Sequence, residues 1–298
     1  MRQMEDTEYD KYGFVRMSYL LVTAAKMGIH VNVIGHQDAY PISSGEPKLV
    51  QYFEERMDIP CDPAYVKNGK VSDYLRFTKS DWSLVDGRGG SDMMHTKLCA
   101  VSHYLDKDGK AHKNAVWTSS QNLDGIKPTG INAHYRMQTA TIISDHEDIW
   151  RASHNYLDLV ADYGDQEGII EFQGLVNSRS TKQIDLIMAG RANEIPKDEQ
   201  IVYLGSKTDD VFELYFTPFG GDIVAWDETY QPYCKYLREM YESEGPILFT
   251  WNAAEYTGKY VLGQQIEEMI TEAFHKNKDV NNKIYTNMES FDGYAAFE

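Results

Sequence analysis

A histidine and a lysine stand at alternate positions, His95 and Lys97, at the start of a segment with strand character. Residues two apart on a strand point to the same face, so an imidazole and an ammonium group would lie side by side. The segment VWTSSQNLD at 116–124 is predicted to end the neighbouring strand, and Ser120 and Asn122 again share one face there. A nucleophile, a cation and two neutral hydrogen-bonding groups, with no carboxylate among them, suit a phosphate group.

This pattern resembles the signature of the phospholipase D superfamily: H-x-K, four further residues, commonly an Asp, and then G-S-x-N on the next strand. The chain reads HTKLCAVS and later SSQN. The matching residues are His95, Lys97, Ser120 and Asn122. Two positions depart from the signature, because Ser102 stands at the Asp and Ser119 stands at the first Gly. The loss of the Asp is the milder departure, since the histidine and the lysine carry the chemistry in the family.

The likeness extends along the chain to the bacterial phospholipase D-like proteins that have two lobes. Asn132 begins a predicted strand, and IISDHEDIW follows it as in that pattern. The acid that usually comes two residues after this asparagine is His134 here. ELYFTPFGGD and ILFTWNAAEYTG resemble the beginning of the second lobe. The resemblance is specific around residues 93–150 and loose elsewhere.

The resemblance implies a phosphodiesterase or phosphatidyl hydrolase-transferase that needs neither a metal nor a cofactor. His95 would attack the phosphorus of a phosphodiester and form a phosphohistidine. Lys97 would hold the non-bridging oxygens as a point charge, while Asn122 with Ser120 would orient the phosphate. Asn132 is implied in substrate binding. In agreement, the sequence has no cluster of Asp, Cys and His at metal-ligand spacing.

The leaving group needs a proton, which in the family comes from a second histidine in the other lobe's motif. This chain has a single H-x-K. Three alternatives follow: a second motif in a missing C-terminal part, a second motif from a homodimer partner as in the single-motif nucleases, or a catalytically inactive binding or structural module that kept the fold. The other late histidines fall in predicted helices and are interpreted as surface residues: His146, His154 and His275.

The elements that must position these residues predict an α/β fold. Helices are expected over 12–28 (ending at Gly28), 45–57, 145–163, 226–243 and 259–276. Strands are expected over 29–35, 71–78, 94–104, 114–120, 132–144, 211–219, 246–251 and 282–288. Asp145 is the expected N-cap of helix 145–163, whose apolar face comprises Ile149, Ala152, Tyr156, Leu159 and Val160. The resemblance adds a mixed β-sheet flanked by helices on both faces.

Two domains are expected. Residues 1–165 form a phospholipase D-like lobe with the H-x-K motif, and residues 166–298 form a junction and the N-terminal part of a second similar lobe without its own motif. The segment 164–210 is the least regular. The late order of strand, helix and strand resembles the early helix and strand, as a weak repeat of elements. On this comparison the first strand of the early lobe is missing, and the chain is expected to be a piece cut at both ends.

The composition and net charge limit the classes of partner that the chain can bind. The chain has 298 residues, 42% of them hydrophobic and 12% aromatic, which excludes disorder. A net charge of −17 disfavours non-specific nucleic-acid binding, and no apolar run is long enough to span a membrane. A phosphodiester, such as a phospholipid head group, is the expected substrate.

The cysteines are interpreted as small buried residues: Cys61, Cys99 and Cys234. Relatives are often exported, so the resemblance implies a secreted or periplasmic parent protein, although this chain begins without a signal peptide.

Overall fold

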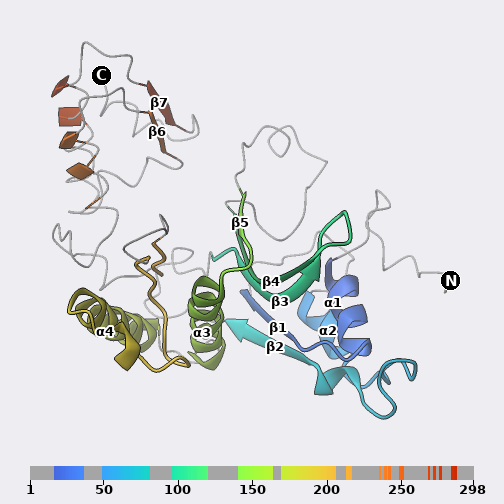
Figure 1. Ribbon diagram of the computed structural model, residues 1–298. Helices are drawn as coiled ribbons and strands as arrows, with labels where there is room; N and C mark the ends of the chain where they lie inside the picture. The colour runs from blue at the N-terminus through green and yellow to red at the C-terminus, as the bar shows by residue number, and fades with distance from the viewer. Residues whose placement is uncertain are drawn as a thin grey trace. The chain divides into compact units, whose positions relative to one another are not determined.

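The structure is a computed structural model that describes residues 17–36, 49–80, 96–119, 140–163, 169–205, 213–216, 235, 238–239, 241–242, 248–251, 268, 271–272, 275–276 and 283–286. These residues form a mixed α/β structure in which small parallel and antiparallel sheets pack against helices (Figure 1). The α/β prediction is confirmed at this level. The chain divides into two compact units: 1–100 with 116–143 and 156–172, and 101–115 with 144–155 and 173–298. The expected domains 1–165 and 166–298 stay a prediction.

The first unit is built on two parallel strands, β1 (Val31–His36) and β2 (Leu75–Ser80). Parallel strands need a crossover connection, and here α2 (Leu49–Glu54) lies within it. Together with α1 (Met17–Lys26), α2 packs beside the strand pair (Figure 1). One apolar cluster holds these elements together: Val22, Ala25, Tyr52, Phe53, Val71 and Leu75.

Gly28 ends α1, as the sequence predicts. Its N–H donates to the carbonyl of Ala25 (2.9 Å), and the N–H of Ile29 donates to the carbonyl of Ala24 (3.1 Å). These two bonds form a Schellman motif, in which the residue after the helix adopts a left-handed conformation. Gly28 has a φ of +82°, which a residue without a Cβ reaches at little cost.

Replacing Gly28 by alanine is expected to lower the free energy of unfolding by about 1–2 kcal/mol, because an L side chain strains this backbone conformation. A Cβ would also lie 2.8 Å from Cγ2 of Val66. Gly109 is a matched control, because its φ is +78° and a Cβ there would meet nothing within 4 Å. Urea unfolding of both variants should show the larger loss for Gly28→Ala. Equal losses would contradict a steric contribution from Val66.

The expected strand 71–78 begins later than predicted. Val71–Asp73 form a short 3-10 helix, and β2 starts at Leu75. The Asp73 carboxylate accepts a hydrogen bond from the N–H of Lys70 over 2.8 Å, which favours a turn over an extended chain.

Three antiparallel strands form a second sheet in the order β3 (Leu98–Leu105), β4 (Ala111–Ser119) and β5 (Ala140–Ile143). Val116 pairs with Ile143, and Ser119 pairs with Ala140. The predicted strands 94–104, 114–120 and 132–144 each coincide in part with one of these. Their remaining predicted residues lie mostly outside the described ranges.

Helix α3 (Glu147–Tyr163) confirms the predicted helix and its apolar face. The face is buried as expected: Ile149, Ala152, Tyr156, Leu159 and Val160. The N-cap prediction was wrong by one residue. His146 Nδ1 accepts from the N–H of Ile149 over 3.3 Å, whereas Asp145 has a φ of +60° and directs its carboxylate to Lys113 and His112.

Helix α4 (Ile169–Met188) corrects the expectation that 164–210 is the least regular segment. Its buried positions recur at helical spacing: Phe172, Val176, Ser180, Gln183 and Ile184. Two of these buried positions are polar, Ser180 and Gln183, so the apolar residues of α4 do not recur at every turn of the helix. Polar residues at buried positions conceal a helix from a search for apolar periodicity.

Elsewhere in the second unit, one expected strand is present only as a single bridge and two others are confirmed. In the described part of segment 211–219, Leu214 makes a single β-bridge with Tyr203 in place of the predicted strand. β6 (Leu248–Trp251) and β7 (Lys283–Thr286) confirm the last two strands and pair in parallel. The described residues within 226–243 and 259–276 are helical. The order strand, helix, strand thus occurs as β1, α2, β2 and again as β6, helix, β7. None of the helices in the described ranges combines the length and the apolarity that a bilayer crossing requires.

Candidate functional site

A tight turn joins β3 to β4 and fixes their register. Asp106 Oδ1 accepts from the N–H groups of Asp108 (2.9 Å) and Lys110 (2.8 Å), and the Asp106 N–H donates to the carbonyl of Lys110 (2.9 Å). Gly109 provides the left-handed conformation with its φ of +78°. The hairpin therefore places the beginning of β3 beside the end of β4.

The H-x-K motif precedes β3 and the S-S-x-N motif begins at the end of β4, and the described residue at the end of one, Lys97, lies beside the first residue of the other, Ser119. The N–H of Ser119 donates to the carbonyl of Lys97 over 3.3 Å, and both residues are half-buried. The expectation that the motif strands are neighbours is confirmed. Among the predicted site residues, Lys97 lies within the described part of the chain. The others lie outside the described residues: His95, Ser120, Asn122 and Asn132.

Both departures from the phospholipase D signature can be located, whereas the departure from the wider two-lobe pattern cannot. Ser102, at the position of the family's Asp, is exposed on β3. Ser119, at the position of the first Gly, is the last residue of β4 and pairs with Ala140 of β5. A residue with a Cβ is thus accommodated in regular strand geometry there. His134 lies outside the described ranges.

Tyr156 of α3 reaches the middle residue of the H-x-K motif, which sequence reasoning missed. Burial raises the pKa of Tyr156 to about 12, and a side-chain hydrogen bond with Thr96 opposes part of that rise. The sequence placed Tyr156 on the buried face of its helix, and a buried tyrosine hydroxyl normally needs a partner. The sequence therefore indicated that the Tyr156 hydroxyl needs a hydrogen-bond partner, but it did not indicate which residue that partner is.

The histidines interpreted as surface residues differ from one another. His154 and His275 are exposed, as predicted. His146 is half-buried, caps α3 and contacts the ring of Tyr203 edge-on at 4.8 Å, so its prediction was wrong. Among the cysteines, Cys61 is buried as expected, whereas Cys99 on β3 is exposed; Cys234 lies outside the described residues.

A separate charged cluster in the second unit surrounds His112 of β4. Its Nδ1 lies 2.9 Å from Asp145 Oδ2 and its Nε2 lies 3.2 Å from Asp106 Oδ2. The ring of Tyr104 stacks on it at 5.0 Å, and the Tyr104 hydroxyl lies 2.7 Å from Ser144 Oγ. The hydrogen bonds to Asp145 and then Asp106 raise the pKa of His112, while burial and, less strongly, the charge of Lys110 oppose the rise. The cluster connects the hairpin turn to the residues before α3.

The His112 cluster is expected to make stability depend on pH. A raised histidine pKa stabilises the fold below the ordinary value of 6.5, and this contribution is lost as the pH rises through the folded-state value. Hydrogen bonds lower the pKa values of Asp106 and Asp145, so their contribution is present above the ordinary 3.8 and is lost in acid. The difference in free energy of unfolding between wild type and His112→Phe should therefore be largest between the ordinary carboxyl pKa of 3.8 and the ordinary histidine pKa of 6.5, and should shrink as the pH rises above 6.5 through the raised pKa of His112.

Phenylalanine keeps a ring against Tyr104 while removing both polar contacts. The variant His154→Phe, at an exposed position of α3, is the control and should show no such pH profile. Urea unfolding at several pH values measures the difference. A wild-type advantage that is independent of pH would contradict the ionic role of His112.

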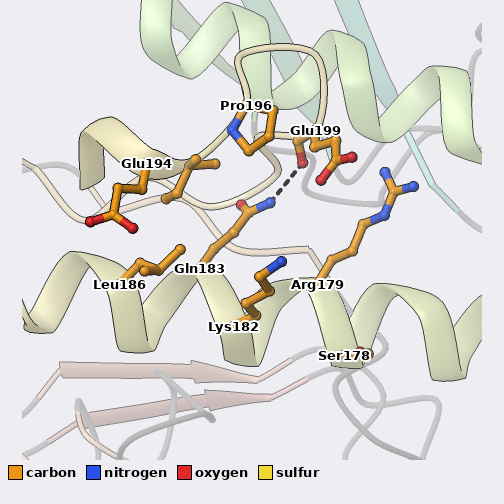
Figure 2. A pocket seen from close by; sticks show the side chains of 9 residues that line it. Ser178, Arg179, Lys182, Gln183, Leu186, Glu194, Pro196 and Glu199 are labelled. Carbon is orange, nitrogen blue, oxygen red and sulfur yellow. Dashed lines mark hydrogen bonds between the residues drawn. The ribbon is translucent and has the colours of Figure 1, made fainter. Parts of the chain in front are cut away.

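A cavity of about 180 Å³ lies beside α4 in the second unit. Its lining residues are Ser178, Arg179, Lys182, Gln183, Leu186, Glu194, Ile195, Pro196 and Glu199. Figure 2 shows Arg179 and Lys182 rising from α4 toward the segment that carries Pro196 and Glu199. Glu194 is paired with Arg191 over 2.6 Å. The lining combines both signs of charge and contains no residue of the H-x-K or S-S-x-N motifs.

Within the described ranges, no group of three or more His, Cys, Asp and Glu side chains is arranged to hold a metal ion. Searches against protein-family models, curated proteins and solved structures found no match to this chain.

Proposed function

We propose that this protein is a metal-independent phosphodiesterase of the phospholipase D type, with His95 as the nucleophile. The observation that carries the proposal is the hydrogen bond between Ser119 and Lys97, because it joins the H-x-K segment to the S-S-x-N segment. The finer fold, a phospholipase D-like lobe followed by the beginning of a second one, belongs to the same proposal. A small diester such as a phospholipid head group is the proposed substrate class, because the net charge of −17 repels nucleic-acid phosphates.

The proposed reaction has two steps. In the first, the imidazole nitrogen of His95 forms a bond to phosphorus while the bond from phosphorus to the leaving oxygen breaks, and the departing alcohol takes a proton. The Lys97 ammonium and the Asn122 amide hold the non-bridging oxygens, where negative charge develops. In the second, the oxygen of water or an alcohol forms a bond to phosphorus while the bond from phosphorus to His95 breaks, and the attacking group gives its proton to the base left by the first step. The proton donor is a second histidine, supplied by a further motif or by a second copy of the chain.

Trapping the covalent intermediate tests the proposal. The protein is incubated with a radiolabelled phosphodiester, quenched in alkali and analysed for phosphate bound to protein. Wild type should carry an acid-labile, alkali-stable phosphoryl group, and His95→Ala should carry none. His103→Ala is the matched control, because His103 is an exposed histidine on β3 outside the motif. Equal labelling of wild type and His95→Ala would overturn the assignment of the nucleophile.

The source of the second histidine is tested by activity against bis-p-nitrophenyl phosphate over a range of protein concentrations. If two chains pair, specific activity should rise with concentration in step with the dimer fraction measured by light scattering. A monomer that forms the labelled adduct but does not turn over indicates a donor from a further motif. A chain with neither adduct nor turnover is an inactive binding module, and the proposal fails.

A further inference from the structure

Each of the two ring nitrogens of His112 faces a carboxylate oxygen. Nδ1 lies 2.9 Å from Asp145 Oδ2, and Nε2 lies 3.2 Å from Asp106 Oδ2. A neutral imidazole carries one N–H donor, whereas an imidazolium carries two. The ring can therefore donate to both ionised carboxylates only while it is protonated. Once it loses a proton, one of its nitrogens presents a lone pair to a negatively charged oxygen, and that contact becomes repulsive.

The two carboxylates are held in different ways. Asp106 belongs to the same hairpin as His112, and its Oδ1 accepts two further N–H groups within the turn. Asp145 lies 33 residues beyond His112 in the sequence. Its N–H donates to the carbonyl of Lys113 over 2.8 Å, and its Oδ1 accepts the N–H of Lys113 over 2.9 Å. Asp106 is thus fixed locally, whereas Asp145 is held by its bonds to β4.

Left-handed backbone adjoins the His112 cluster on both strands of chain. Asp145 has a φ of +60°, and Asn114, which follows Lys113, has a φ of +50°. Within the described ranges, these two are the residues other than glycine with a positive φ. A residue with a Cβ adopts this conformation at a cost, and such strain persists where surrounding contacts enforce it. For Asp145 those contacts are the bonds to Lys113 and His112.

The ring of His112 is enclosed where the hairpin meets the segment that enters α3. Its side chain is 14% exposed, and the Tyr104 ring stacks on it with 18° between the planes. The Tyr104 hydroxyl lies 2.7 Å from Oγ of Ser144, the residue before Asp145. In the described structure, the charged and titratable groups around the ring are Tyr104, Asp106, Lys110 and Asp145.

We propose that His112 is a pH-sensitive switch that holds the segment entering α3, residues 144–146, against the β3–β4 hairpin. The protonated ring binds both carboxylates and keeps Asp145 in its left-handed conformation. When Nδ1 gives its proton to solvent, the remaining N–H on Nε2 stays with Asp106 in the turn. The Nδ1 lone pair then repels the Asp145 carboxylate, whose departure relieves the backbone strain and loosens the entrance to α3. This inference does not depend on the proposed function.

The switch is tested by NMR spectroscopy on the whole chain. The ¹⁵N shifts of the His112 ring, followed against pH, give its pKa in the folded protein and identify the neutral tautomer, which should carry its proton on Nε2. Amide exchange of residues 145–147, corrected for intrinsic base catalysis and compared with amides of α4, should accelerate roughly 10-fold above the measured pKa, as expected for one lost charge-assisted hydrogen bond. Amides 108–110 in the turn should not show this step.

Asp145→Asn is the decisive variant. An asparagine amide can donate to the neutral Nδ1, and asparagine tolerates the left-handed conformation, so residues 145–147 should stay protected above the pKa of His112. Asp108→Asn is the matched control, because Asp108 is an exposed carboxylate of the turn, and it should keep the wild-type step.

The wild-type measurement decides the proposal even if a variant fails to fold. Exchange at 145–147 that shows no step across the measured pKa of His112 overturns the switch. A step at 108–110 in its place, or a neutral ring protonated on Nδ1, shows that Asp106 is released and overturns the assigned direction. A step that persists unchanged in a folded Asp145→Asn protein shows that His112 does not act through Asp145.

Discussion

Replacing Lys97 by alanine should lower kcat/KM for a phosphodiester by about 100- to 1000-fold, as expected when one preorganised charge on a developing oxyanion is removed. The loss should appear mainly in kcat, because negative charge builds up on the phosphoryl oxygens in the transition state. The hydrogen bond from Ser119 is accepted by the main-chain carbonyl of Lys97, so replacing the Lys97 side chain leaves this link between the motif segments intact.

Lys97→Arg is the conservative variant, and it should recover only part of the activity. Arginine keeps the charge but spreads it over a planar fork, which does not reproduce a compact ammonium group. Lys107→Ala is the control, since Lys107 is exposed in the turn between β3 and β4. Steady-state kinetics on the same substrate measure all three variants. A Lys97→Ala protein with wild-type kcat/KM would remove the cation from the proposed mechanism.

The second large effect is expected from Gln183→Leu, which should lower the free energy of unfolding by about 2–4 kcal/mol. Gln183 Oε1 accepts the N–H groups of Ile201 (2.9 Å) and Val202 (3.2 Å), and its Nε2 donates to the carbonyl of Glu199 (2.7 Å; Figure 2). Ile201 and Val202 are fully buried. Leucine fills a similar space but leaves these buried backbone groups without partners, and each such group costs about 1–3 kcal/mol.

Gln51→Leu is the matched control, because Gln51 is exposed on α2 and its side-chain amide donates to Glu55 Oε1, which is also exposed, over 2.8 Å. Its effect should stay within about 0.5 kcal/mol. Urea unfolding gives the overall loss, and amide exchange at residues 201–202 gives the local one. Unchanged exchange at these amides in Gln183→Leu would show that Gln183 does not anchor this segment.

Apolar period and turn chemistry account for the parts of the fold that were predicted. Gly28 ends α1 because a left-handed residue was needed there, and five apolar positions of α3 are buried because they recur at helical spacing. The hairpin could be expected from the DKDGK turn. Each of these features depends on residues close together in the sequence.

The predictions that were wrong concern residues whose partners lie far away in the sequence. Helix α4 was not predicted because a polar residue, Gln183, occupies one of its buried positions. Gln183 is buried there because its side chain accepts a hydrogen bond from the distant backbone N–H of Ile201. Asp145 was assigned to the helix cap, yet its carboxylate is bonded to Lys113 and His112 of β4. For the candidate site, the motif residues and the adjacency of their strands could be predicted, but Tyr156 could not, since nothing local pairs it with Thr96.

The hairpin that joins the two motifs also bears on the kinetics of folding. Its turn closes through the side chain of Asp106 over a few residues, so β3 and β4 pair through local contacts. Hairpins of this kind form in about 1–10 μs, whereas parallel pairs such as β1 with β2 must first close a longer loop. We therefore expect the segments bearing Lys97 and Ser119 to come together early in folding, before β1 pairs with β2.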